Sequence, residues 1–214
     1  MRNSVNALLI ATGNAGKLRE IEQLFPPPTP ISLHSVAEMR GLKPIDETGA
    51  TFAENARLKA GGYALQTKMW SLADDSGLEV AALNGEPGVR SARFAGGHTP
   101  YDEKIRRLLE MMRDAGSDDR SARFVCAMAV SDPAGNIRFT SEGECHGRIA
   151  FEPRGKNGFG YDPIFIPDDF ESTFAELSDD IKQQISHRGR AAEQIIRYIL
   201  DFMGVSLDQS IIRL

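Results

Sequence analysis

Cysteine, histidine and tryptophan are scarce in this sequence of 214 residues. The two cysteines, Cys126 and Cys145, have no CxxC spacing and lie in strand-like runs, so neither a zinc site nor a disulfide framework is expected. The four histidines lack H-x-x-x-H and H-E-x-x-H spacing, which argues against the usual zinc motifs. The sequence also lacks a G-x-S-x-G elbow, and His146 is merely adjacent to Cys145, so nucleophilic catalysis is weakly supported.

An excess of positive charge is missing as well. Lysine and arginine number 25 against 30 aspartate and glutamate residues, and the formal net charge of -5 makes nucleic acid an unexpected partner. The apolar stretch in residues 1–11 is too short to span a membrane and ends in a polar turn. We therefore expect a cytoplasmic protein that uses neither membrane nor nucleic acid. A small anionic substrate fits, because a pocket can be locally positive and a divalent cation would help.

The beginning of the chain predicts alternating strands and helices. Residues 6–11 are a nearly continuous apolar run, typical of a buried strand that ends at a turn. A helix follows, and the prolines at 26, 27, 28 and 30 stop it. Residues 31–36 then alternate in polarity as a second strand does.

The next segment leads to a pair of carboxylates. Thr51 and Glu54 have capping-box spacing, which predicts a helix over residues 51–68. Residues 71–73 form a strand, and the sequence Asp-Asp-Ser-Gly at 74–77 predicts that this strand gives way there to a loop.

The later part of the chain predicts a hairpin between two helices. Residues 101–115 have helical spacing, and the strands 124–130 and 137–139 flank a turn-rich insert, which joins them most simply as an antiparallel pair. A final helix is amphipathic. Its buried stripe comprises Ala191, Ile195, Ile196, Ile199 and Leu200.

These elements together predict an α/β fold with a mixed sheet. The length and the 41% apolar content are sufficient for a single domain over residues 1–214, with residues 204–214 as an extension.

The segment TGNAGK at 12–17 is a candidate phosphate site, because it joins a strand to a helix. Free N–H groups and the helix dipole could hold phosphate there while Lys17 neutralises its charge. The segment is not a Walker A loop, since Leu18 stands where a metal-binding Ser or Thr belongs. The alternative is a structural turn in which Asn14 caps the helix.

Two acidic segments are candidate magnesium ligands. Asp74 and Asp75 are adjacent at a strand, so their side chains should point in different directions, one facing a site and the other supporting it. Mg²⁺ prefers hard oxygen ligands, and a carboxylate can also accept a proton from attacking water. Asp46 and Glu47 would complete the metal shell if the fold brings them near Asp75. Ordinary turn or helix-start chemistry is the alternative for both segments.

Two further segments could contact a nucleobase. The sequence GFGYDP at 158–163 offers aromatic faces and a carboxylate for stacking and edge recognition, or alternatively a tight turn covered by aromatics. His187 and Arg188 begin a helix, where positive charge opposes the helix dipole and needs an anionic or base-edge partner. A solvated basic helix start with Ser186 as its N-cap is the alternative.

Seven segments taken together resemble the inosine/xanthosine triphosphate pyrophosphatase family, and the match spans nearly the whole chain in order. They are TGNAGK at 12–17, DETG at 46–49, TFAENA at 51–56, ADDSGL at 73–78, PGVRSARF at 87–94, GFGYDPIF at 158–165 and SHRGRA at 186–191. The resemblance implies an elongated α/β fold, a central mixed sheet flanked by helices, and a substrate cleft between two lobes. It also implies a homodimer that uses Mg²⁺ to cleave ITP, dITP and XTP to the monophosphate and pyrophosphate.

The resemblance further implies roles for individual residues. Asp75 would be the general base and a metal ligand, with Glu47 and either Asp74 or Asp46 completing the metal environment. The residues implied to hold the triphosphate are Thr12, Gly13, Asn14, Ala15, Gly16 and Lys17, with a contact from Ser76. Those implied to surround the base and sugar are Phe159, Gly160, Tyr161, Asp162, Lys182, His187 and Arg188.

The implied substrate is chemically consistent with these residues. A 6-oxo purine has an acceptor where adenine has a donor amine, so cationic donors such as Lys182 and Arg188 would favour it. Two alternatives stay open. One is a related pyrophosphatase that acts on other modified or ordinary dNTPs, and the other is a non-catalytic nucleotide-binding module.

Overall fold

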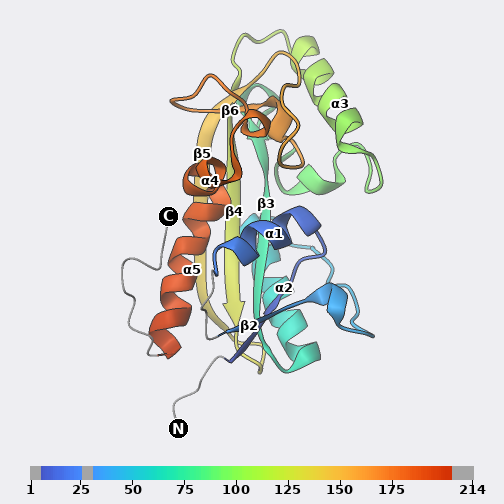
Figure 1. The fold of residues 1–214 in the computed structure, drawn as a ribbon. Coiled ribbons are helices and arrows are strands. Elements are labelled where there is room, and N and C mark those ends of the chain that lie inside the picture. Colours follow the sequence, from blue (N-terminus) through green and yellow to red (C-terminus); the bar gives the residue numbers. More distant parts are fainter. Residues whose placement is uncertain (1–5, 26–30, 204–214) are drawn as a thin grey trace. The chain divides into compact units, whose positions relative to one another are not determined.

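A computed structural model describes residues 6–25 and 31–203 of the chain (Figure 1). Within these residues the strands are β1 (Ala7–Ile10), β2 (Ser32–Ser35), β3 (Trp70–Val80), β4 (Ser121–Ser131), β5 (Ile137–Ile149) and β6 (Phe165–Pro167). They form a sheet in the order β2-β1-β3-β4-β5-β6. β1 is parallel to β2 and β3, whereas β5 and β6 are antiparallel. The sheet is therefore mixed, which confirms the predicted α/β fold class.

The α-helices within the described residues are α1 (Ala15–Gln23), α2 (Phe52–Thr67), α3 (Tyr101–Asp114), α4 (Asp179–Ile185) and α5 (His187–Met203). The predicted capping box of α2 is present, because the backbone N–H of Glu54 donates to Thr51 Oγ1 at 3.2 Å. β4 and β5 are neighbouring strands joined by five residues, so they form the predicted hairpin. The prolines in 26–30 and the extension over 204–214 lie outside the described residues.

One local prediction was wrong. The sequence at 74–77 was expected to leave the strand as a loop, yet β3 continues through it to Val80. The register of β3 with β1 ends at Leu72, but β4, an 11-residue strand, is hydrogen-bonded along the other side of β3. This pairing overrides the turn preference of Asp, Ser and Gly. The two carboxylates therefore lie inside a strand.

The chain divides into two compact units. Unit 1 comprises Met1–Asp75, Cys126–Gly143 and Arg188–Leu214, and unit 2 comprises Ser76–Val125 and Glu144–His187. That residues 1–214 behave as a single domain stays a prediction.

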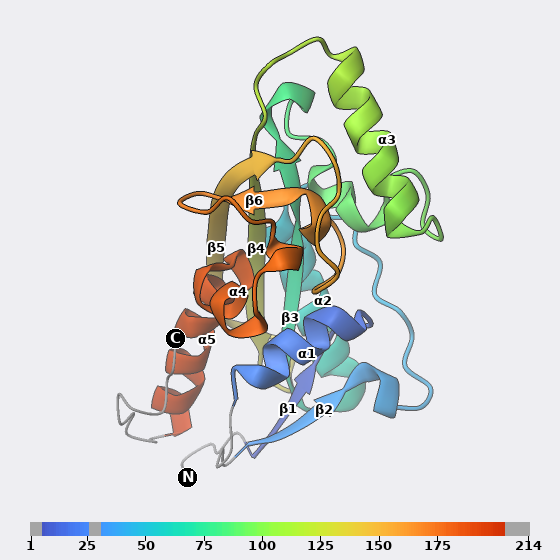
Figure 2. The same ribbon diagram turned by 45° about the horizontal axis from the view of Figure 1, so that its top comes forward.

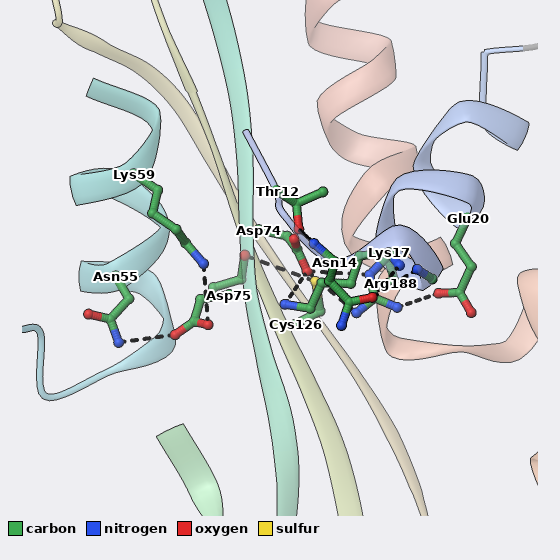
Figure 3. Close-up of polar contacts among 12 residues, drawn as sticks. Thr12, Asn14, Lys17, Glu20, Asn55, Lys59, Asp74, Asp75, Cys126 and Arg188 are labelled. Carbon is green, nitrogen blue, oxygen red and sulfur yellow. Dashed lines mark hydrogen bonds and ion pairs between the residues drawn. The ribbon is translucent and has the colours of Figure 1, made fainter. Parts of the chain in front are cut away.

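Unit 1 has an apolar core between its strands and the helices α1 and α5, while α2 covers the opposite face of those strands (Figures 1 and 3). The predicted stripe of α5 is buried throughout, which confirms the amphipathic interpretation. Core residues include Leu8, Ile10, Ile21, Leu72, Met128 and Ile195.

Unit 2 has a separate core in which aromatic side chains are prominent. α3 contributes Ile105, Leu108 and Met112 to it, as the helical spacing predicted. β6 runs along β5 at the edge of the sheet (Figure 2). No helix in the described part of the chain is both long enough and apolar enough to cross a membrane.

The unit 1 core predicts a large difference between two substitutions. Ile195 is 0% exposed, so Ile195→Ala should leave a cavity and lower the free energy of unfolding by about 2–5 kcal/mol. Leu58 is 41% exposed on α2, and Leu58→Ala should change stability by no more than about 0.5 kcal/mol. Urea unfolding followed by circular dichroism measures both. Equal losses would show that α5 does not pack as described.

Candidate active site

The alternation of β3 separates its two acidic side chains. Asp74 shares a strand face with Leu72, whose side chain lies in the core under α1 and α5, whereas Asp75 points toward α2 (Figure 3). The sequence prediction that the two carboxylates point in different directions is confirmed. They therefore have different partners.

Asp74 is a fully buried carboxylate held by two cations. Its Oδ2 lies 2.9 Å from Lys17 Nζ and 3.4 Å from Arg188 Nε. Arg188 also pairs with Glu20 on α1. Burial alone would raise the pKa of Asp74, but the charges of Lys17 and Arg188 outweigh it and hold that pKa well below its ordinary value. Asp74 is thus ionised and links the beginnings of α1 and α5.

Asp75 has a contrasting environment. Its Oδ2 accepts a hydrogen bond of 3.0 Å from Asn55 Nδ2, and its Oδ1 lies 3.5 Å from Lys59 Nζ. Lys59 also contacts Glu47 Oε1 at 2.7 Å. Burial raises the pKa of Asp75 above its ordinary value, and the Lys59 charge opposes this only in part. Such a carboxylate is a stronger proton acceptor than an exposed aspartate.

Glu47 and Asp75 form a donor set that fits Mg²⁺. Both direct a carboxylate oxygen at one cation, the Lys59 ammonium, and Mg²⁺ is commonly bound by one or two carboxylates together with phosphate oxygens and water. The described residues contain no group of three or more His, Cys, Asp or Glu side chains suited to a metal. Asp74 faces Lys17 and Arg188 on the other side of β3, and Asp46 is exposed. Glu47 and Asp75 are therefore the better candidates.

The TGNAGK turn shows the capping geometry that was the structural alternative for this segment. Asn14 Oδ1 accepts from the backbone N–H groups of Gly16 at 2.8 Å and Lys17 at 3.1 Å. The N–H of Asn14 itself donates to Thr12 Oγ1 at 3.2 Å. Asn14 thus caps α1 with N–H groups that the phosphate hypothesis would assign to a ligand. That these residues, with Gly13 and Ala15, hold triphosphate stays a prediction.

Unit 2 brings several of the predicted base-contacting residues together. Asp162 Oδ2 accepts from Lys182 Nζ at 2.5 Å and from the backbone N–H of Phe159 at 2.7 Å. Lys182 Nζ also lies 4.9 Å from the centre of the Phe159 ring. Gly158 has a φ of 73°, and a Cβ there would come within 2.1 Å of Asp162 Oδ2. Glycine is therefore required for this turn to close around the carboxylate.

Tyr161 and His187 occupy packed positions in unit 2. Tyr161 is 2% exposed, and its hydroxyl donates to the carbonyl oxygen of Ser91 at 3.1 Å. The His187 ring stacks on Phe124 with ring centres 4.7 Å apart. Both side chains thus contribute to packing in this structure, and their predicted contacts with base or sugar stay predictions.

The remaining predicted residues have simple placements. Ser76 follows Asp75 in β3 and is half-buried. Gly160 has a φ of 71°, and a Cβ there would lie 3.6 Å from the Tyr101 ring. Arg188 meets the expectation that positive charge at the start of a helix needs an anionic partner, since Asp74 and Glu20 both pair with it.

Three residues of these clusters were missed by sequence reasoning. Asn55 and Lys59 are four positions apart on α2 and therefore lie on one face, but only the fold shows that this face meets Asp75. Glu20 resembled an ordinary surface residue of a helix. The sequence did contain a signal for Lys59. It lies four residues after Asn55, on the same helix face, and the helix follows the acidic segment 46–47 closely, so an ion pair between them could have been expected.

Comparisons with known proteins show the family of this chain. A model of the Ham1 family matches residues 8–198. The chain belongs to the Ham1 family. Proteins named dITP/XTP pyrophosphatase from Rhodopirellula baltica and Gloeobacter violaceus are 42% and 46% identical to it. Their alignments cover 92% and 88% of this chain and 95% and 92% of the relatives.

A solved structure of a HAM1 protein from Coxiella burnetii is also similar, with a TM-score of 0.83 and 42% identity. The match covers 91% of this chain and 98% of the Coxiella burnetii chain. These findings confirm the resemblance that the seven sequence segments indicated. The matched residues 8–198 include Asp74 and Asp75 with the partners described above, and also the Asp162 cluster, which consists of Asp162, Lys182 and Phe159.

The Asp74 cluster of this Ham1 chain predicts a pH-dependent contribution to stability. Asp74→Asn removes the carboxylate shared by the buried Arg188 and the half-buried Lys17, and should lower the free energy of unfolding by about 3–5 kcal/mol at pH 7, although Arg188 keeps its pairing with Glu20. Because the folded pKa of Asp74 lies below its unfolded value of about 3.9, this difference should persist above about pH 5 and shrink as the pH falls below about 4. Urea unfolding across pH measures it. A variant as stable as the wild type at pH 7 would contradict the assignment.

The matched substitution Asp75→Asn should behave differently. The raised folded pKa of Asp75 means that its ionised form opposes folding at neutral pH, so removing the charge should leave stability unchanged or increased at pH 7. The same urea titrations test this. A loss as large as that of Asp74→Asn would show that Asp75 is not in the environment described.

Proposed function

We propose that this chain hydrolyses deaminated purine nucleoside triphosphates, namely ITP, dITP and XTP, to the nucleoside monophosphate and pyrophosphate. The relatives named dITP/XTP pyrophosphatase, at 42% and 46% identity over most of both chains, support this substrate class. The structural observation that carries the chemistry is the convergence of Asp75 and Glu47 on one cation. Such an arrangement suits a metal-assisted attack of water on a phosphorus atom.

Asp75 is the proposed general base. Burial raises its pKa, which strengthens its affinity for the proton of an attacking water. The Asn55 amide binds one of its oxygens, while the other faces Lys59. That second oxygen is the one we assign to the metal or to the water.

Glu47 and Asp75 would hold Mg²⁺, which supplies charge neutralisation and activates water when bound. Lys59 is positively charged, since the fields of Asp75, Asp74 and Glu47 outweigh its burial and raise its pKa. We assign Lys17 and Lys59 to neutralising the triphosphate.

The Asp162 cluster is the proposed base-recognition element. Asp162 orients the Lys182 ammonium, and that ammonium can donate to the 6-oxo group of hypoxanthine or xanthine, where adenine presents an amine. Phe159 provides an aromatic face beside the same ammonium. We also propose, from the resemblance, that the enzyme is a cytoplasmic homodimer.

A substrate panel tests the proposal. With Mg²⁺ present, ITP and XTP should turn over much faster than ATP or GTP, and pyrophosphate rather than orthophosphate should be released. Ion chromatography identifies the products. Equal rates for all purines would remove the specificity, and preferred turnover of ordinary dNTPs would favour a related pyrophosphatase.

The assignment of the base makes a separate prediction. Asp75→Asn should abolish turnover of ITP while leaving binding of the triphosphate largely intact, because the amide keeps the shape of the side chain but cannot accept the proton. Calorimetric titration with a non-hydrolysable ITP analogue checks the binding. Undiminished turnover in this variant would refute the assignment, and a wild type without turnover of any nucleotide would favour a non-catalytic module.

A further inference from the structure

Asn55 is a fully buried amide that bridges two parts of the proposed metal site. Its Nδ2 donates to Asp75 Oδ2 at 3.0 Å, and its Oδ1 accepts from the backbone N–H of Gly49 at 2.8 Å. A backbone N–H can only donate and an ionised carboxylate can only accept. The two partners therefore fix the orientation of the amide, and each of them occupies a different end of it.

Gly49 lies two residues after Glu47 and comes unusually close to α2. A Cβ at Gly49 would lie 2.6 Å from Glu54 Cβ and 2.8 Å from Asn55 Oδ1. A side chain at this position would force the loop away from the helix, and the hydrogen bond to Asn55 would be lost with it. The close approach thus couples the backbone beside Glu47 to the amide that holds Asp75.

We propose that Asn55 is a positioning residue that holds the Asp75 carboxylate and the loop carrying Glu47 in one arrangement. The proposal rests on the proposed function, because it assigns these carboxylates to the same catalytic cation. In this proposal Asn55 acts through its hydrogen bonds to Asp75 and to the Gly49 backbone, and not by binding substrate or metal itself. It acts as a support for two ligands at once, and loss of such outer supports typically lowers metal affinity or activity by about 10- to 100-fold.

The same helix offers a matched control. Gln66 on α2 accepts from the backbone N–H of Lys43 at 2.8 Å and donates to the Lys43 carbonyl oxygen at 3.0 Å. This amide also tethers the segment that precedes α2, but its bonds are exposed and involve only backbone groups of Lys43. Gln66→Ala therefore removes a tether of that segment without touching Asp75.

Two substitutions of Asn55 separate the halves of the bridge. Asn55→Asp keeps an oxygen for the Gly49 N–H but replaces the donor to Asp75 by a repelling carboxylate oxygen. Asn55→Leu removes both hydrogen bonds at similar volume. Two measurements on the full chain follow: kcat and KM for ITP with Mg²⁺, and hydrogen exchange of the Gly49 amide by NMR without added metal.

Asn55→Asp should lower kcat by about 10- to 100-fold with little change in KM, and the Gly49 amide should stay protected from exchange. Asn55→Leu should lower kcat at least as far, and the Gly49 amide should lose its protection. Gln66→Ala should match the wild type in both measurements. If Asn55 had a purely structural role, its substitution would change stability instead. The change in kcat relative to the change in KM would then be the same in all three variants.

The outcomes distinguish this inference from the function on which it rests. Wild-type kcat in both Asn55 variants, together with an inactive Asp75→Asn, would overturn the positioning role and leave the proposed function standing. A loss of kcat in Gln66→Ala equal to that in Asn55→Asp would also overturn it, because any loosened tether would then have the same effect. An active Asp75→Asn would refute the assignment of the base, and a wild type that turns over no nucleotide would overturn the proposed function itself.

Discussion

The charge distribution of unit 1 depends on the two-residue repeat of a single strand. Because β3 turns successive side chains to opposite faces, the neighbouring carboxylates of Asp74 and Asp75 have different environments. The charges of Lys17 and Arg188 stabilise the ionised form of Asp74 by more than burial destabilises it. Asp75 is left with a net desolvation penalty. One strand thereby provides both an ionic support for the helices and a carboxylate with raised proton affinity.

Much of the fold could be predicted because its signals are local. Thr51 and Glu54 begin α2 through their own hydrogen bonds, and the apolar stripe of α5 is buried as its spacing indicated. The hairpin of β4 and β5 also followed from a turn between two strand-like runs. Glu47 and Asp75 were candidates from their acidic segments and Asp162 from the GFGYDP segment, whereas Lys182 was singled out through the resemblance. In the structure Lys59 contacts both Glu47 and Asp75, and Lys182 pairs with Asp162.

The rest depended on contacts between segments that are distant in sequence. The residues at 74–77 have turn chemistry, yet they stay extended inside β3, which is hydrogen-bonded to β4 in the sheet. Asn55 and Lys59 look like ordinary helix residues until α2 is placed against the face of β3 that carries Asp75. From the sequence, Asn14 could either bind phosphate or cap a helix. Its side chain accepts hydrogen bonds from the backbone of Gly16 and Lys17, which shows that it caps α1. Such choices are decided by tertiary structure.

The difference in pKa between the two adjacent carboxylates can be measured directly. Side-chain ¹³C carboxyl shifts of Asp74 and Asp75, assigned through single Asp→Asn variants and followed by NMR against pH in the metal-free protein, report each ionisation separately. Asp75 should titrate above the ordinary aspartate pKa of about 3.9, and Asp74 should titrate below it. Two carboxylates that titrate together, or in the reverse order, would contradict this expectation.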